Sequence, residues 1–511
     1  MKSNQSKFFI FLLVLLSVHV NATWVLPPSD LSDPGEHALS SRVCFNNTGT
    51  AFIIWRRAEG VNTIVQASIF DGSSFSKAQN LSESGKNVFS SQVCCNNAGN
   101  AIVIWSINEL ANTIIQVSHY DNRTSSWSSP STISTSTGGI SAPDICCDNF
   151  GNAFAIWNAG SGASQVIQIS RYDGITWSAP ESISANGQVA NAPQICCDNN
   201  GNAFAIWQEY NGTNTLIVSS YFNGSSWSPF EPLSLPGSNH ANPQICCNDN
   251  GNAIAIWSQE TDNFIQSSQF IDSKWNFLGN VSDATQTNTF GPKICCNSDG
   301  NAFATWQASN GTNNVIQSSI FDGSIWSPNT QLSFSGQNAL AGNICCDEFG
   351  NAIAVWSGSI SVQSIIRTSF FNGTFWSNPF DLSEAGGNAN GASISCDFMG
   401  NAVASWDRSE GINRIIQATF NLSSPKNLSG FLRINRFASQ STITTLLRWD
   451  RFPPSLVANY KIYRNGILIA TIPGTQNVYR DCTINFCQTY SYSIIAVGQN
   501  GEESESQTII L

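Results

Sequence analysis

Two groups of charged residues stand out in a chain that is otherwise poor in charge, since only 11% of its 511 residues are Asp, Glu, Lys or Arg. Arginine binds carboxylate and phosphate groups through paired N–H donors. A cluster of arginines therefore predicts a site for an anion or an acidic sugar. The alternative is a network of solvated ion pairs, which is common on protein surfaces. The candidate ligand-binding residues are Arg56, Arg57, Glu59, Arg408, Glu410 and Arg414.

Cysteine is the second residue type whose spacing predicts chemistry. The chain has 16 Cys, most of them in adjacent doublets such as Cys196-Cys197. Adjacent residues of a strand point to opposite faces, so one thiol of a doublet faces the preceding repeat and the other faces the next. Joining the first Cys of each repeat to the second Cys of the following one leaves none over. This scheme predicts Cys44–Cys95, Cys94–Cys147, Cys146–Cys197, Cys196–Cys247, Cys246–Cys296, Cys295–Cys346 and Cys345–Cys396.

Three alternatives for these cysteines stay open. Vicinal disulfides would leave Cys44 and Cys396 unexplained, and buried free thiols would not explain matched single cysteines at the two ends. Zinc sites favour separated pairs with His partners, and no doublet has a His beside it. The histidines show no paired nucleophile, and the sequence has no phosphate-binding glycine loop. We therefore expect no metal, no cofactor and no catalytic residue.

These residues lie in eight copies of a repeat whose period is near 50 residues, which is typical of a propeller or a solenoid. In one copy, two β-prone apolar runs, Ile195–Cys197 and Ala203–Trp207, are joined by a polar turn. The third and fourth strands are expected at Leu216–Phe222 and Trp227–Ser234. Both faces of the second strand are apolar, so the sheet must be covered on both sides. The pattern predicts an all-β fold, an eight-bladed β-propeller with four-stranded blades. The marker Trp residues are Trp55, Trp105, Trp157, Trp207, Trp257, Trp306, Trp356 and Trp406.

The two ends of the repeat region complement each other. Thr23–Ser32 aligns with the fourth strand of the other copies, whereas the last copy stops after its third strand at Phe420. We expect the N-terminal strand to close the last blade, so that the propeller spans residues 23–422. At this seam the expected disulfide is absent, because Phe45 and Ser395 take the places of cysteines.

Residues 1–22 have the features of a secretory signal peptide: two Lys, an apolar run and a cleavage site of small residues. The apolar run is too short to cross a bilayer, and we expect no transmembrane segment. The expected location is secreted, periplasmic or cell surface. The formal net charge is −12, and loss of the two Lys makes it −14. Such a chain is not expected to bind nucleic acid, which requires many Lys and Arg.

The C-terminal residues 426–511 resemble a fibronectin type III domain. The resemblance rests on Leu446–Trp449, the hairpin Tyr460–Gly466 and the strand Tyr490–Val497. It implies an adhesive or spacer module, and Cys482 and Cys487 are expected to form a local disulfide.

The turn before the fourth strand, Tyr172–Trp177, looks like the Asp-box of sialidase-type propellers but departs from it because Asp173 and Gly174 are adjacent. The whole repeat is similar to those of secreted bacterial propellers. Sialidases use an arginine triad with a Tyr and a Glu on six blades, and glycoside hydrolysis generally needs two carboxylates. The resemblance therefore implies a structural turn rather than a catalytic site.

Comparison of the copies separates two kinds of connection. The turns after the first and third strands hardly vary, whereas the connections after the second and fourth strands vary in length and residues. Variable loops on a rigid scaffold often bind ligands. We expect a monomeric binding or adhesion protein that recognises a glycan or a protein through the variable loops. The alternatives are a glycoside hydrolase or lyase, and an envelope component crosslinked through free thiols.

Overall fold

The computed structural model describes residues 23–109, 112–135, 138–162, 165–284, 286–360, 362–436, 441–485 and 488–511. The predicted signal peptide lies outside this set. No α-helix occurs among the described residues, which form ten antiparallel sheets. None of the described residues builds a helix with the length and apolarity that crossing a bilayer requires.

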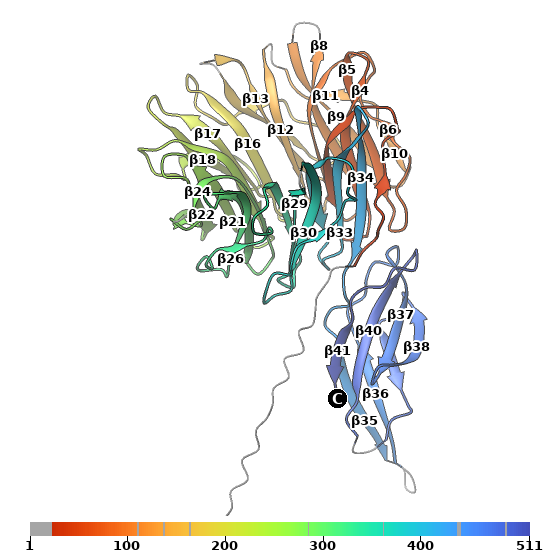
Figure 1. Cartoon of the computed structure of the whole chain (residues 1–511). Helices are drawn as coiled ribbons and strands as arrows, with labels where there is room; N and C mark the ends of the chain where they lie inside the picture. Colours follow the sequence, from red (N-terminus) through yellow and green to blue (C-terminus); the bar gives the residue numbers. More distant parts are fainter. Residues whose placement is uncertain are drawn as a thin grey trace, which may run out of the picture.

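Eight of the ten sheets correspond to the eight repeats, as the sequence predicted, and they follow one another in chain order in Figure 1. We number them sheets 1 to 8 by their first strands. The first strands are β3 (Ala38–Phe45), β7 (Val88–Cys95), β12 (Ile140–Cys147), β16 (Ala190–Cys197), β20 (His240–Cys247), β24 (Thr287–Cys296), β28 (Ala339–Cys346) and β32 (Ala389–Cys396). The second strands are β4 (Ala51–Glu59), β8 (Ala101–Glu109), β13 (Ala153–Ala159), β17 (Ala203–Tyr210), β21 (Ala253–Gln259), β25 (Ala302–Ser309), β29 (Ala352–Ile360) and β33 (Ala402–Glu410).

The outer strands complete each sheet. The third strands are β5 (Asn62–Phe70), β9 (Asn112–Asp121), β14 (Val166–Tyr172), β18 (Thr215–Phe222), β22 (Phe264–Ile271), β26 (Asn314–Phe321), β30 (Gln363–Phe371) and β34 (Asn413–Leu422). The fourth strand of sheet 5 is β23 (Lys274–Asn280), which has seven residues. The other fourth strands have segments of only two residues: β6 (Gln79–Asn80), β10 (Ser126–Trp127) with β11 (Ser131–Thr132), β15 (Glu181–Ser182), β19 (Glu231–Pro232), β27 (Thr330–Gln331) and β31 (Phe380–Asp381). Short edges that include Pro232 limit pairing with other chains.

The N-terminal residues supply the fourth strand of sheet 8, as predicted. β1 (Thr23–Trp24) and β2 (Ser29–Asp30) both pair antiparallel with β34. The first strands also contact one another in succession, and β32 of sheet 8 contacts β3 of sheet 1.

The second strand of each repeat forms the core between neighbouring sheets. All eight marker Trp side chains are at most 1% exposed. A buried indole N–H requires an acceptor, and in five of the eight repeats a Gln of the third strand supplies it. Trp55 Nε1 donates to Gln66 Oε1 at 3.0 Å, and Trp406 Nε1 donates to Gln417 Oε1 at 3.1 Å. Each Gln lies opposite its Trp in the strand register, so packing and hydrogen bonding fix the same register.

The turns after the first strands link the sheets to one another. Within one turn, Asp198 Oδ1 accepts the N–H groups of Asn200 and Asn202 at 2.8 and 2.9 Å, which is the typical way that Asp stabilises a turn. The following residue reaches the next sheet, because Asn199 N donates to Asp249 Oδ1 at 3.0 Å. Equivalent bonds join Asn47 to Asn97, Asn97 to Asn149, Asn149 to Asn199, Ser298 to Glu348, and Phe398 of sheet 8 back to Asn47 of sheet 1.

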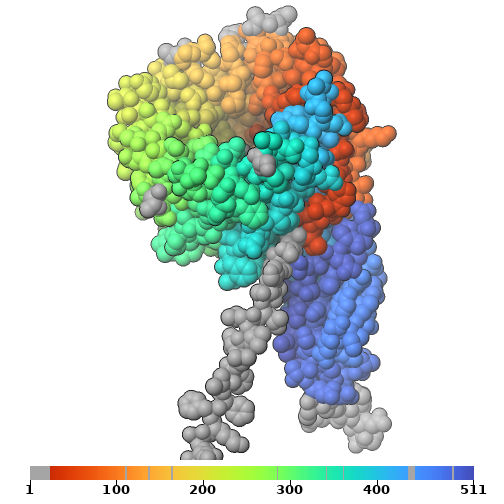
Figure 2. Space-filling model, viewed as in Figure 1, coloured from red at the N-terminus to blue at the C-terminus, as the bar shows by residue number. Residues whose placement is uncertain are grey.

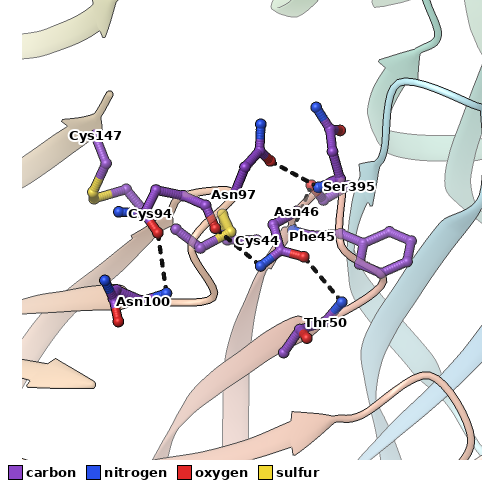
Figure 3. The surroundings of a disulfide bond; sticks show 12 residues. Cys44, Phe45, Asn46, Thr50, Cys94, Asn97, Asn100, Cys147 and Ser395 are labelled. Carbon is purple, nitrogen blue, oxygen red and sulfur yellow. Dashed lines mark hydrogen bonds between the residues drawn. A yellow bond between two sulfur atoms is a disulfide. The ribbon is translucent and has the colours of Figure 1, made fainter. Parts of the chain in front are cut away.

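Six of the seven predicted disulfides between sheets are present, with Cα–Cα distances of 5.6–6.0 Å. Packed sheets are usually about 10 Å apart, so the sheets converge at their first strands. At the seam between sheets 8 and 1, the Phe45 N–H donates to Ser395 Oγ at 3.0 Å in place of the missing disulfide (Figure 3). Disulfides in this number indicate folding in an oxidising compartment.

The seventh predicted disulfide was wrong, because Cys146 and Cys197 are free thiols. Burial and the neighbouring Cys197 raise the pKa of the Cys146 thiol well above its ordinary value. Cys482 is exposed, and Cys487 lies outside the described residues, so their pairing stays a prediction.

The remaining two sheets belong to the C-terminal residues. One has three strands in the order β35 (Ser429–Arg436), β36 (Ser441–Arg448) and β39 (Val478–Asp481). The other has four strands in the order β38 (Ile467–Pro473), β37 (Val457–Arg464), β40 (Ser491–Gly498) and β41 (Gln507–Ile510). The predicted core residue Trp449 is 3% exposed. Its ring lies 5.2 Å from that of Tyr460 in an edge-to-face contact.

The C-terminal sheets lie against the turns of sheet 1, beside the red and cyan sheets in Figure 1. In an antiparallel sheet, the turns after the first and third strands lie at the same end. We call this end the turn end; in sheet 1 it comprises residues 46–50 and 71–75. The opposite end, with the connections after the second and fourth strands, is the loop end. Ser455 Oγ donates to Thr48 O at 2.9 Å, and Asn500 Nδ2 donates to Ser73 O at 2.5 Å. The C-terminal sheets therefore cover part of the turn end.

Candidate functional site

The six charged residues singled out in the sequence lie at the loop end of sheets 1 and 8. Arg57 forms an ion pair with Glu36 and a second with Glu59 at 3.4 Å, and its side chain is only 13% exposed. Arg56 donates to Ser40 Oγ at 2.9 Å and to Phe89 O at 2.6 Å. Both arginines of sheet 1 are thus held by groups of the protein.

The arginines of sheet 8 are also paired. Arg408 lies 3.7 Å from a carboxylate oxygen of Glu384, and Arg414 lies 2.6 Å from one of Asp407. Burial raises the pKa of Asp407, and the nearby Arg414 counteracts this effect. Glu410 is exposed. This geometry favours the second interpretation of the cluster, ion pairs within the protein that hold the loops in place.

A set of polar side chains that the sequence reasoning missed lies on the first strands, two residues before the first Cys position of each repeat. The next residue is Val or Ile in every copy. Since successive strand residues face opposite ways, the polar residues share one side of their strands. We call these residues the inner polar set: Arg42, Gln92, Asp144, Gln194, Gln244, Lys293, Asn343 and Ser393.

A β-bulge that recurs in several sheets sets the direction of these side chains. In sheets 3, 4 and 5 the pairing register is interrupted by a bulge just before Asp144, Gln194 and Gln244. The bulge places Ala142 and Ala192 at φ +48° and +50°, a left-handed conformation that costs about 1 kcal/mol for a residue other than Gly. Bulges often redirect a side chain near a functional site. The same left-handed residue recurs before Asp144 and Gln194, so the bulge is a regular feature of this repeat.

Amide side chains connect the members of the inner polar set across neighbouring sheets. Lys293 Nζ donates to Gln244 Oε1 at 2.9 Å, and Gln244 Nε2 donates to Gln194 Oε1 at 3.0 Å. Arg42 Nε donates to Gln92 Oε1 at 3.1 Å. The side chains of Arg42 and Lys293 therefore donate to neutral amide oxygens rather than to carboxylates.

The three charged members interact electrostatically without forming ion pairs. The Asp144 carboxylate accepts the Ile195 N–H at 3.0 Å, and burial raises its pKa to about 6. Burial, with a smaller contribution from Arg42, lowers the pKa of Lys293 to about 8. The ion pairs formed within the described residues include none of Arg42, Asp144 and Lys293.

Arg42 combines two properties that indicate a partly enclosed, solvent-accessible space. The side chain is solvent-accessible, yet desolvation lowers its pKa. Figure 2 shows a hollow between the sheets on one face of the molecule. Two cations and one carboxylate around such a space would attract an anion more strongly than a neutral group.

Comparison with known proteins does not assign the chain to a family. No family model matches the chain, and no curated protein matches it. Solved structures that it resembles include an ulvan lyase, described as a new family of polysaccharide lyase (TM-score 0.43, 9% identity, 78% of this chain and 94% of that chain). Another is a fungal alcohol oxidase of the AA5 family in complex with copper (0.42, 12%, 81% and 95%). A third is a protein of unknown function from Dyadobacter fermentans (0.41, 10%, 79% and 99%). These similarities are too low to transfer a function.

Proposed function

We propose that this protein is a secreted or cell-surface binding protein that takes an acidic glycan at the inner polar set, entering from the loop end. The observation that carries the proposal is that Arg42 and Lys293 face the enclosed space with neutral hydrogen-bond partners only. An arginine binds a carboxylate, sulfate or phosphate group through two parallel N–H donors. An oxyanion would thus supply the charge that the protein itself leaves uncompensated.

The proposal includes a closed ring of eight blades over residues 23–422 and a fibronectin type III domain over 426–511. The contact between β32 and β3 supports closure. In such a ring, Arg42, Asp144 and Lys293 stand on sheets 1, 3 and 6 and surround the axis. The division into sheets of three and four strands supports the fibronectin type III assignment.

The direction of entry follows from what covers the other end. Ser455 and Asn500 of the C-terminal sheets contact the turn end of sheet 1, whereas the variable connections lie at the loop end. In this proposal Arg57 and Arg408 hold the loops around the entrance, and the exposed Glu410 is available to the ligand. A protein partner on the same loops, a monomeric state, and the alternative of a glycoside hydrolase or lyase stay predictions from the sequence.

The test is calorimetric titration with D-glucuronate and D-glucose 6-sulfate. The variant Arg42→Gln with Lys293→Gln places at both positions the residue that three other repeats carry there, so folding should be preserved. We expect its affinity for the acidic probes to fall at least about tenfold, and the wild-type affinity to weaken with added salt. Lys274→Gln, which removes an exposed charge of sheet 5, is the matched control. Unchanged affinity in the double variant, or no binding by the wild-type protein, would contradict the proposal.

A further inference from the structure

A separate cavity of about 320 Å³ lies between sheets 2 and 3 at the turn end, away from the inner polar set. Small-molecule sites typically have volumes of about 300–1,000 Å³, so this cavity has room for a single small ligand. Its walls come from the third strands β9 and β14 and from the turns that flank them.

An insertion in the repeat builds one wall of this cavity. The turn from Asp121 to Trp127 is two residues longer than the equivalent turn from Asp173 to Trp177. The longer turn contacts the first turn of its own sheet. Asn122 Nδ2 donates to Ala98 O at 3.1 Å, and Asn122 N donates to Asn100 Oδ1 at 3.0 Å. The cavity thus arises where the otherwise constant turn end departs from its pattern.

The charges that the insertion brings to the cavity cancel each other. Arg123 Nε lies 3.1 Å from one carboxylate oxygen of Asp121, and Arg123 Nη2 lies 2.9 Å from the other. Such a two-point pair leaves little net charge to attract an ion. The cavity therefore favours a neutral ligand, whereas the inner polar set favours an anion.

Aromatic rings form the inner wall. The ring of His119 lies 4.6 Å from that of Tyr172. Trp177 Nε1 donates to His119 Nε2 at 3.1 Å, which places the imidazole proton on Nδ1. Burial lowers the pKa of His119, so this wall is uncharged at neutral pH.

An exposed aromatic residue stands at the rim. Phe150 lines the cavity and is 78% exposed. The equivalent Phe349 of sheet 7 is 37% exposed and has the Lys426 ammonium group over its ring at 5.5 Å. Only one of these two phenylalanines is therefore available as a platform for a ligand.

Two amide groups of the wall are available for hydrogen bonds. Asn100 Oδ1 is used by the Asn122 N–H, and Asn152 Nδ2 is used by Asp148. The opposite atoms, Asn100 Nδ2 and Asn152 Oδ1, form no hydrogen bond within the part of the chain that the structure describes. The wall thus offers a donor and an acceptor beside the aromatic rings.

We propose that this cavity binds one neutral pyranose unit of a glycan. The C–H face of a pyranose is apolar and packs on an aromatic ring such as Phe150, while its hydroxyl groups both donate and accept hydrogen bonds. Asn100 and Asn152 provide the complementary atoms. The site is independent of the acidic-ligand site, and each can fail without the other.

The experiment is saturation-transfer NMR with D-glucose, D-galactose, D-mannose and L-rhamnose on the mature chain. We expect at least one sugar to bind, and Phe150→Ala to weaken its affinity at least about tenfold with an unchanged melting temperature, because Phe150 is exposed. Ile325→Ala removes an exposed apolar side chain of sheet 6 (67% exposed) and should bind like the wild type. The Arg42→Gln Lys293→Gln variant should also bind normally, which separates this site from the acidic one.

Three results would overturn this inference. The first is that none of the neutral sugars binds. The second is that the Phe150→Ala variant binds as well as the wild type. The third is that D-glucuronate binds in this cavity in preference to D-glucose and that its binding depends on Arg123. The last result would show that the site takes an acidic rather than a neutral sugar.

Discussion

The turn end and the loop end of the eight sheets use the same repeat in different ways. At the turn end, the backbone N–H groups of Asn47 and Asn199 donate to side chains of the next sheet, and the C-terminal sheets contact sheet 1. At the loop end, the connection after the second strand is two residues long in sheets 1, 2, 7 and 8 but four to six in sheets 3 to 6. Two tips there, Val61 and Ile412, are each 97% exposed.

The comparison teaches where this repeat can vary. A turn that bonds to its neighbours is constrained by both adjacent sheets, so a change in one copy disturbs three sheets. A loop tip that contacts no other sheet is free to change. The cavity beside Phe150 is instructive because it arises from an insertion at the constrained end, and that insertion forms compensating bonds to Ala98 and Asn100.

The largest expected effect comes from deleting residues 23–32, because this removes the strands that join the two ends of the repeat region. The buried side chains Trp24 and Leu31 are lost, and the outer edge of β34 becomes an unpaired edge prone to association. We expect the melting temperature to fall by about 10 °C or more, or the protein to aggregate in size-exclusion chromatography. A truncated chain that stays monomeric and melts like the wild type would contradict the structural role of β1 and β2.

A smaller effect is expected at Gly72, which lies under the C-terminal sheets at φ +98°. A Cβ atom there would lie 2.6 Å from Ser455 O, whereas at Gly323, the equivalent position of sheet 6 with φ +93°, it would meet nothing within 4 Å. Both Gly→Ala variants pay backbone strain of about 1–2 kcal/mol. We expect Gly72→Ala to cost about 1–3 kcal/mol more, measured by chemical denaturation. Equal losses would show that the C-terminal sheets do not constrain this turn.

The smallest effect concerns Asp397 in the first turn of sheet 8, which is 1% exposed. Its carboxylate accepts the N–H groups of Met399 and Asn401 at 3.0 and 2.9 Å, yet burial raises its pKa to about 7. An unfolded Asp titrates near about 3.9. The native state therefore holds a proton that the unfolded chain has released, and the stability of the wild type falls as the pH rises from about 4 to about 7.

Asp397→Asn removes this pH-dependent loss. Asn occupies the equivalent turn position in four other repeats, Asn46, Asn96, Asn248 and Asn297. We expect the free energy of unfolding of the variant to exceed that of the wild type above pH 7, and the two to be equal near pH 4. Urea unfolding of both proteins across this range measures the difference. Parallel profiles for the two proteins would refute the raised pKa of Asp397.

Features that depend on repetition could be predicted from the sequence. The eight copies can be aligned with one another. The period of the repeat and the alternation of apolar residues therefore predicted the four strands, the buried Trp positions and the N-terminal pairing with β34. Six disulfides followed from adjacent cysteines facing opposite sheets. The sequence could not exclude the pair Cys146–Cys197, because its spacing is the same as that of the bonded pairs.

The candidate site was less accessible to sequence reasoning. Arg57 and Arg408 were conspicuous because charge is rare, but their partners Glu36 and Glu384 lie on other connections and are found only in space. The inner polar set carried a readable signal, a polar residue two positions before the first Cys of every copy. Such a pattern resembles ordinary strand alternation. Only the convergence of the first strands indicates that these residues face a shared interior.

The pairing of the N-terminal strands with β34 has a consequence for how the chain folds as it is synthesised. Val25 O accepts a hydrogen bond from Thr419 Oγ1, and Ser32 Oγ accepts one from the Ile416 N–H; these partners are 394 and 384 residues apart. Residues 23–32 are made before residues 413–422, so β1 and β2 can pair only after almost the whole repeat region has been synthesised. Until then the outer edge of β34 is unpaired, and so are β1 and β2. Between the synthesis of these strands and their pairing, their unpaired edges are accessible to proteases and to other copies of the chain.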